Sequence, residues 1–194
     1  MAAREFFIDP SRCIACQSCV QACAECDTHR GQSMINFDFI DRPEMIGSAA
    51  YVCFHCEDPT CAQVCPADAI KKGADGIVQS ALDPRCIGCS NCVIACPFGI
   101  PKMKVKQEQM MKCDMCYDRT SVGLKPMCAT VCPSQALTFA TPEEIALSRR
   151  EQPTNVFHFG DQRVVTKVFM MVPEGVDAVS IDVADYIWEP QPWR

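Results

Sequence analysis

The chain has 194 residues, enough for one sizeable domain or two small ones, and 48 % of them are apolar. The net charge of −6 gives no reason to expect a nucleic-acid partner, and no run approaches the roughly eighteen apolar residues of a membrane span. Residues 1–7 lack the long apolar segment of a signal peptide, so we expect a cytoplasmic protein.

The first half of the chain combines short regular elements with two groups of four cysteines. Residues 5–9 predict a strand, residues 18–25 a short helix and residues 76–78 a second strand. The first group is Cys13, Cys16, Cys19 and Cys23, and the second is Cys53, Cys56, Cys61 and Cys65. Proline follows the last cysteine of the second group but not of the first, so the chain must leave the first group differently.

Two further groups of four cysteines follow, with the same mixture of elements. The third group is Cys86, Cys89, Cys92 and Cys96, and the fourth is Cys113, Cys116, Cys128 and Cys132. We expect a helix at residues 90–95 and strands at residues 102–106 and 136–139. Short helices and strands set among loops that carry the cysteines predict a loop-rich, ferredoxin-like α+β fold.

The C-terminal extension, residues 141–194, contains no cysteine. Thr141 is a good N-cap residue, and the proline and two glutamates that follow it favour the first turn of a helix. We expect this helix to end near Arg150. Two predicted strands of a β-hairpin and an aromatic, proline-rich tail follow at residues 163–172, 176–183 and 186–194. We expect this extension to cap the core or to act as an arm that docks onto a partner subunit.

The spacing of the cysteines is typical of iron–sulfur ligation. Each [4Fe–4S] cluster takes four thiolates, so the sixteen grouped cysteines among the 17 allow four clusters. The third group matches the bacterial ferredoxin run C-x2-C-x2-C-x3-C-P, whose fourth cysteine binds the other cluster of a pair. The second group has a longer gap between its second and third cysteines, and the fourth has an insertion of eleven residues between Cys116 and Cys128. The twenty residues between Cys65 and Cys86 favour pairing of the second group with the third.

Other uses of these thiols fit the pattern less well. Zinc sites are also built from CxxC pairs, but zinc ribbons use two separated pairs rather than four consecutive groups. Disulfide bridges are disfavoured by the close spacing and by the odd total of 17, which indicates metal-loaded thiols in a reducing compartment. We expect Cys26, the ungrouped thiol, to be a buried free cysteine, with a substitute ligand or a thiol at the edge of a cluster as the alternative. No other thiol is set apart, so we expect no catalytic residue.

The histidines and lysines have less specific signals. We expect His29, His55 and His158 in packing or surface positions rather than as ligands, although His55 could donate a hydrogen bond near a sulfur and so tune a potential. The lysines that precede the fourth group predict a solvated strand face, with stabilisation of a reduced cluster as the alternative. These lysines are Lys102, Lys104, Lys106 and Lys112.

Four features together give the chain a family resemblance over about residues 6–139. They are the order of the cysteine groups, the segment Cys53–Pro59, the Cys96–Gly99 turn and the insertion in the fourth group. With these features the chain resembles the four-cluster ferredoxin-like subunits of molybdopterin or tungstopterin oxidoreductases. Examples are those of dimethyl sulfoxide reductase, formate dehydrogenase, formate hydrogenlyase, polysulfide reductase and tungsten aldehyde oxidoreductase.

The resemblance implies an electron-transfer subunit that is not catalytic by itself. It would relay single electrons through four [4Fe–4S] clusters between a molybdenum or tungsten pterin subunit and a second redox partner. The alternative is a free or self-stacking polyferredoxin, as in the tungsten aldehyde oxidoreductases, in which copies of the chain are the partners. Relatives can also be exported folded with a signal-bearing partner, which leaves an alternative to a cytoplasmic location.

The resemblance also implies a nested arrangement, in which the second group pairs with the third and the first with the fourth. The ligand sets would be Cys13, Cys16, Cys19 and Cys132 for cluster 1; Cys23, Cys113, Cys116 and Cys128 for cluster 2; Cys53, Cys56, Cys61 and Cys96 for cluster 3; and Cys65, Cys86, Cys89 and Cys92 for cluster 4. Two nested dicluster-ferredoxin-like modules would then form the core, residues 1–140. The outer module would comprise about residues 1–50 and 105–140, and the inner module about residues 51–104.

Overall fold

The computed structural model describes residues 4–42, 45–82, 84–104 and 108–172. Within these ranges the fold is mixed α/β, with small sheets, short helices and long loops, as the sequence predicts. The helices are η1 (Pro10–Arg12), α1 (Ser18–Ala24), η2 (Asp27–His29), α2 (Thr60–Gln63), α3 (Asn91–Ile94), α4 (Tyr117–Thr120), α5 (Met127–Val131) and α6 (Pro142–Ser148). The strands are β1 (Glu5–Ile8), β2 (Asn36–Arg42), β3 (Met45–Tyr51), β4 (Lys102–Lys104), β5 (Gln109–Met111), β6 (Leu137–Ala140), β7 (Gln152–Phe159) and β8 (Gln162–Val172). None of these helices has the length and apolar character needed to cross a bilayer.

The largest sheet joins the two ends of the described chain. Its strand order is β6-β1-β8-β7, with β1 antiparallel to β6 and parallel to β8. Side chains alternate across β1, as expected for a strand. Phe6 and Ile8 pack into the main core, while Phe7 packs on the other face with Ile145 of α6 and Met171 of β8. The sheet is therefore covered on both faces, and only one of these faces meets the cysteines.

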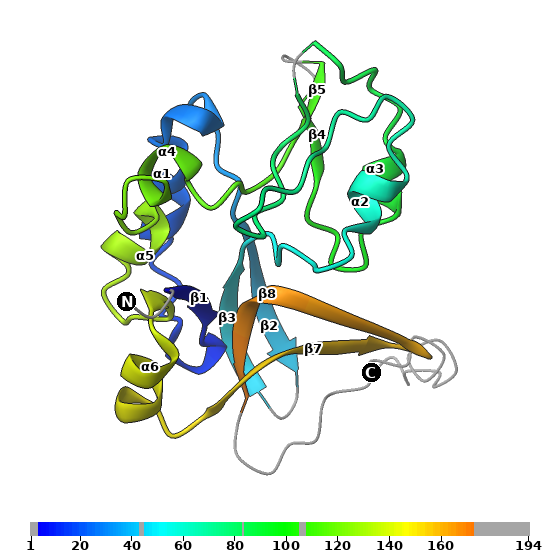
Figure 1. Ribbon diagram of the computed structural model, residues 1–194. Coiled ribbons are helices and arrows are strands. Elements are labelled where there is room, and N and C mark those ends of the chain that lie inside the picture. The colour runs from blue at the N-terminus through cyan, green and yellow to red at the C-terminus, as the bar shows by residue number, and fades with distance from the viewer. Residues whose placement is uncertain (1–3, 43–44, 83, 105–107, 173–194) are drawn as a thin grey trace, which may run out of the picture.

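Two two-stranded sheets complete the fold: the β2–β3 hairpin and the β4–β5 pair. Figure 1 shows α1, α4 and α5 together on one side of the molecule and α2 with α3 on the other. The β4–β5 pair lies on the side of α2 and α3, and the largest sheet lies below both groups of helices.

The predicted helices and most of the predicted strands are confirmed within the described residues. Elements form at the predicted positions of β1, α1, α3, β6, α6 and β8, and β4 covers the start of the strand predicted at 102–106. Residues 76–78 form only an isolated bridge, from Val78 to Lys72, rather than a strand. The β2–β3 hairpin was not predicted.

The β-hairpin of the extension exists, but its strands differ from those predicted. β8 pairs with β7, which precedes it, and Gly160 with a φ of 56° lies in the tight turn between them. β7 begins with polar residues and Pro153, which is tolerated because β7 is an edge strand. The other predicted strand, residues 176–183, and the tail at 186–194 lie outside the described residues.

Candidate metal centres

The same local backbone geometry recurs in all four cysteine groups. The residue before the second cysteine of each group has a positive φ: 59° at Ala15, 48° at His55, 69° at Gly88 and 63° at Met115. A left-handed residue at this position turns the chain sharply between two thiols, and only glycine adopts it without strain. The four groups are therefore structural repeats and not only repeats in sequence.

The Cys-Pro exits form a second repeated feature. In three groups, the N–H of the third residue after the last cysteine donates to that cysteine's carbonyl: Asp68 to Cys65 at 3.1 Å, Gly99 to Cys96 at 3.1 Å and Gln135 to Cys132 at 3.2 Å. All three donor residues have a positive φ. The first group lacks the proline and leaves differently, because α1 continues beyond Cys23 and leads into η2.

Packed helix pairs bring cysteine groups together in two places. α1, with Cys19 and Cys23, packs against α5, which carries Cys128. α2, with Cys61, packs against α3, with Cys92. The first group therefore meets the fourth, and the second meets the third.

Neighbouring thiols of the second and third groups influence one another's pKa. Burial, together with the charges of Cys53, Cys96 and Cys61, raises the pKa of the Cys56 thiol to about 12. Burial also raises the pKa of Cys92, and the neighbouring charges there belong to Cys89, Cys65 and Cys86.

The first and fourth groups form two corresponding neighbourhoods. Burial, together with the charges of Cys132, Cys13 and Cys16, raises the pKa of Cys19 to about 11. Burial raises the pKa of Cys128 well above its ordinary value, with contributions from Cys113, Cys116, Cys23 and Cys19.

This donor set fits a strongly cationic group better than free thiols. All 17 cysteines are free rather than paired in disulfides. Thiolates crowded together and buried are unfavourable without compensation, and metal ions supply it. Backbone N–H groups already donate to several of the sulfurs, as from Met34 to Cys23 at 3.2 Å and from Ala69 to Cys65 at 3.3 Å. Such bonds to ligand sulfurs are a known means of tuning cluster potentials.

His29 links the first and fourth groups. It is 1 % exposed, its Nε2 lies 2.9 Å from Asp114 Oδ1, and its Nδ1 lies 3.3 Å from Cys23 Sγ. Burial opposes protonation of His29, but its bonds to Asp114 and Cys23 raise its pKa to about 11. His29 therefore occupies a packing position, as expected, and it also connects two cysteine groups. Its spacing from Cys23 gave no sign of this connection.

Cys26 and His55 are buried, whereas His158 is not. Cys26 is buried, and its Sγ donates to Asp118 Oδ1 at 3.1 Å. The ligand atoms of Cys26, His29 and Cys116 lie within 4.8 Å of one another. His55 is fully buried and its Nδ1 accepts a hydrogen bond from the Val78 N–H at 3.0 Å, whereas His158 is exposed.

The expectation of a solvated lysine face is wrong for Lys112. Lys102 and Lys104 on β4 are half-buried, but only 1 % of Lys112 is exposed. Lys112 follows β5, all of whose residues are buried, rather than the half-buried β4. Lys106 lies outside the described residues.

Comparison with known proteins agrees with this geometry. The model of the 4Fe–4S dicluster domain matches residues 46–142, and that of the 4Fe–4S binding domain matches residues 6–23. The B subunit of the anaerobic dimethyl sulfoxide reductase of Escherichia coli K12 is 33 % identical over 203 residues, which cover 96 % of each protein. The iron–sulfur subunit of the nitrate-inducible formate dehydrogenase of the same organism is 34 % identical over 160 residues, covering 71 % of this chain and 54 % of that subunit. Its probable anaerobic dimethyl sulfoxide reductase subunit YnfG is 37 % identical over 153 residues, covering 72 % and 74 %.

The chain therefore belongs to the family of [4Fe–4S] ferredoxin-like subunits of molybdopterin oxidoreductases. Within that family it is an iron–sulfur electron-transfer subunit, which is not catalytic by itself. The resemblance inferred from the cysteine groups is confirmed. The relationship favours a subunit of an oxidoreductase complex over a free or self-stacking polyferredoxin.

Proposed function

We propose that the chain is a four-cluster wire with the ligand sets that the family resemblance implies. Cluster 1 is held by Cys13, Cys16, Cys19 and Cys132; cluster 2 by Cys23, Cys113, Cys116 and Cys128; cluster 3 by Cys53, Cys56, Cys61 and Cys96; and cluster 4 by Cys65, Cys86, Cys89 and Cys92. The observation that carries this proposal is that the thiols of each set are neighbours. The charges acting on one thiol of each set come from the other three, with Cys19 as the one addition at Cys128.

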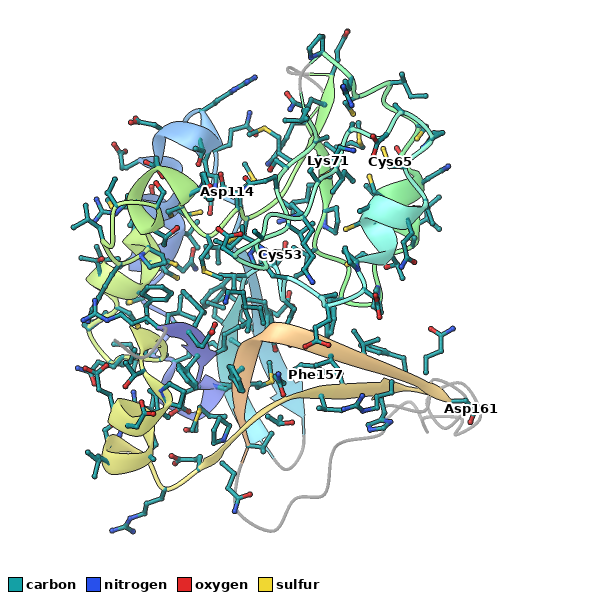
Figure 2. All side chains as sticks on the ribbon, viewed as in Figure 1. Cys53, Cys65, Lys71, Asp114, Phe157 and Asp161 are labelled. Carbon is teal, nitrogen blue, oxygen red and sulfur yellow. The ribbon has the colours of Figure 1, made fainter. Side chains whose placement is uncertain are left out.

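The contacts between sets support a linear order 1-2-3-4. Cys19 of set 1 adds to the charge at Cys128 of set 2. Cys53 of set 3 acts on Cys113 of set 2, and Cys92 of set 4 acts on Cys61 of set 3. In Figure 2, Cys53 lies in the middle of the molecule, between Asp114 of the fourth group and Cys65 beside α2 and α3.

The burial of the thiols supports the same order. All four cysteines of set 2 are buried, as are two of set 3. Each terminal set contains an exposed cysteine: Cys16 in set 1 and Cys89 in set 4. A wire needs access for electrons at its ends and insulation in its middle, and the chain's own side chains provide both.

The nested modules follow from this allocation. Sets 1 and 2 define the outer module, about residues 1–50 and 105–140, and sets 3 and 4 define the inner module, about residues 51–104. The extension then acts as a cap. β8 pairs with β1 of the outer module, and Val165 of β8 accepts a hydrogen bond at 2.8 Å from the N–H of Glu57 in the second group.

Each cluster, when bound, can accept and release one electron. The residues around the sets provide spacing, insulation and hydrogen bonds to the sulfurs. One end of the wire would meet a molybdenum or tungsten pterin subunit and the other a second redox partner. Exposed apolar side chains lie at both ends, with Ile14 63 % exposed between two ligands of set 1 and Ile87 68 % exposed between two ligands of set 4. These side chains suit burial against a partner.

The proposal is tested by anaerobic purification of the native complex through a tag on this chain. The expected result is about sixteen irons per chain, from four clusters, together with a co-purifying subunit that contains molybdenum or tungsten. Zinc in place of iron would reject the cluster assignment. Full iron without a pterin subunit would reject the proposed partner but leave the wire intact.

A further inference from the structure

Lys112 occupies the junction between the proposed outer and inner modules. Its Nζ donates to the carbonyl of Cys113, in set 2, at 3.1 Å, and to the carbonyl of Val78, in the inner module. Ser80 fixes the backbone of Lys112 on both sides, because its Oγ donates to the Lys112 carbonyl at 2.8 Å and accepts from the Lys112 N–H at 3.1 Å. The ammonium group is therefore held in place rather than swinging toward solvent.

The buried charge of Lys112 has no carboxylate partner among the ion pairs of the described residues. Asp114, the acid nearest to it in sequence, is bonded to His29. A buried ammonium without a counter-charge is costly, so the side chain requires negative charge nearby. Val78, whose carbonyl accepts from Lys112, donates its N–H to His55 Nδ1 at 3.0 Å, and His55 lies between Cys53 and Cys56 of set 3.

Thiolate-bound clusters can provide the missing negative charge. Their cysteines bring one negative charge each, and reduction of a cluster adds one more. Lys112 contacts the backbone of a set 2 ligand and, through Val78, the segment of His55 between two set 3 ligands, so its charge lies between the two middle sets. A fixed cation in a poorly solvated position interacts more strongly with an added electron than a surface cation does.

We propose that Lys112 is a positioning residue for electron transfer, which raises the reduction potentials of clusters 2 and 3 relative to those of clusters 1 and 4. This inference rests on the ligand sets of the proposed function. Lys112 thereby favours the presence of the electron on the two clusters at the junction of the modules. Added salt should change its effect on the potentials only slightly, because buried charges are screened far less than exposed ones.

The test compares Lys112→Gln with Lys112→Arg in the anaerobically purified holoprotein, using redox titrations followed by electron paramagnetic resonance. Both variants keep an N–H donor, and only the arginine variant keeps the charge. For Lys112→Gln we expect the reduction equilibrium of two clusters to become about tenfold less favourable, which is 59 mV for a one-electron couple. The other two potentials should stay closer to those of the wild type. Lys112→Arg should retain all four.

Lys104→Gln is the matched control, because Lys104 lies on β4 and is only half-buried. Its smaller effect should disappear at high salt, whereas that of Lys112→Gln should persist. The inference is overturned if all four potentials in Lys112→Gln equal those of the wild type, if all four fall together, or if Lys112→Arg lowers them equally. The iron content of the wild-type protein distinguishes failure of the inference about Lys112 from failure of the proposed function. A chain with fewer than four clusters refutes the ligand sets, whereas four clusters with unmoved potentials refute only the role of Lys112.

Discussion

The middle of the proposed wire differs from its two ends in burial and in the kind of side chain that surrounds it. Set 2 is completely buried, next to the His29–Asp114 pair and the fixed cation of Lys112. Sets 1 and 4 each have an exposed cysteine and a neighbouring exposed isoleucine. A protein that contains several copies of one ligand group can thus use burial to give these copies different tasks. Here the ends are suited to exchange with partners, and the middle to insulated transfer.

The largest expected effect comes from removing a ligand at the middle rather than at an end. Cys128→Ser removes a fully buried ligand of set 2, at the packed contact between α1 and α5. Because metal binding is coupled to folding, we expect little folded protein and loss of iron from more than one set. Cys89→Ser removes an exposed ligand of set 4, so it should lose at most the iron of one cluster.

Iron per chain and far-ultraviolet circular dichroism of anaerobically purified protein provide the measurement. Cys26→Ser is a matched control, because Cys26 is also buried but lies outside the four sets. It should retain all the iron. Equal losses in Cys128→Ser and Cys89→Ser would remove the distinction between middle and ends.

Iron removal from the wild type should distinguish the same two regions without mutation. With an excess of chelator under anaerobic conditions, we expect release in two phases, in which about half of the iron leaves first. The terminal sets open to solvent by small local motions, whereas release from the middle sets requires larger opening of the fold. The time course of the coloured iron–chelator complex reports both phases. A single phase for all of the iron would contradict the proposed order of burial.

The proposed ligand residues come from the sequence alone, because the chemistry of cluster binding is local. Three of the four cysteines in each set lie within one short segment, except where the fourth group has its insertion, and their spacing alone identifies an iron–sulfur site. Burial could not be predicted in the same way. Alternation at residues 102–106 suggested a solvated lysine face, yet Lys112 lies past a second strand whose residues are all buried. Its environment comes from Val78 and Ser80, which lie more than thirty residues away in sequence.

The hairpin of the extension shows the same limit for the fold. β7 has polar residues and a proline at its start, and these obscure the strand pattern. Its identity as a strand depends on pairing with β8 and on the aromatic side chains that it contacts. These partners are distant in sequence and cannot be identified from a short segment. The N-cap at Thr141 can be, because its partner is only three residues away.

Phe157 tests whether this hairpin insulates the middle of the wire. Its ring contacts those of Phe54 and Phe98 at 5.2 Å each, and these two rings stack at 4.2 Å beside ligands of set 3. Figure 2 shows Phe157 on β7, below Cys53. We expect Phe157→Ala to lower the free energy of unfolding by about 3 kcal/mol. It should also move iron of set 3 from the slow to the fast phase of release.

Denaturant unfolding of the holoprotein and the chelator experiment measure the two effects. His158→Ala, on the same strand but exposed, is the control and should change neither. A destabilised Phe157→Ala protein with an unchanged slow phase would show that the hairpin stabilises the fold without shielding set 3.

The smallest expected effect lies on the face of the sheet that does not meet the cysteines. Thr141 caps α6: its Oγ1 accepts from the Glu144 N–H at 3.3 Å, and its own N–H donates to the Glu144 carboxylate at 3.0 Å. Thr141→Ala should cost about 1 kcal/mol of unfolding free energy, whereas Thr141→Ser keeps the capping oxygen and should cost much less. α6 packs through Ile145 onto Phe7 and Met171, away from the four ligand sets. Both phases of iron release should therefore be unchanged in Thr141→Ala. An increased rate of the slow phase of iron release in this variant would mean that the burial of the middle sets depends on the whole extension rather than on the β7–β8 hairpin.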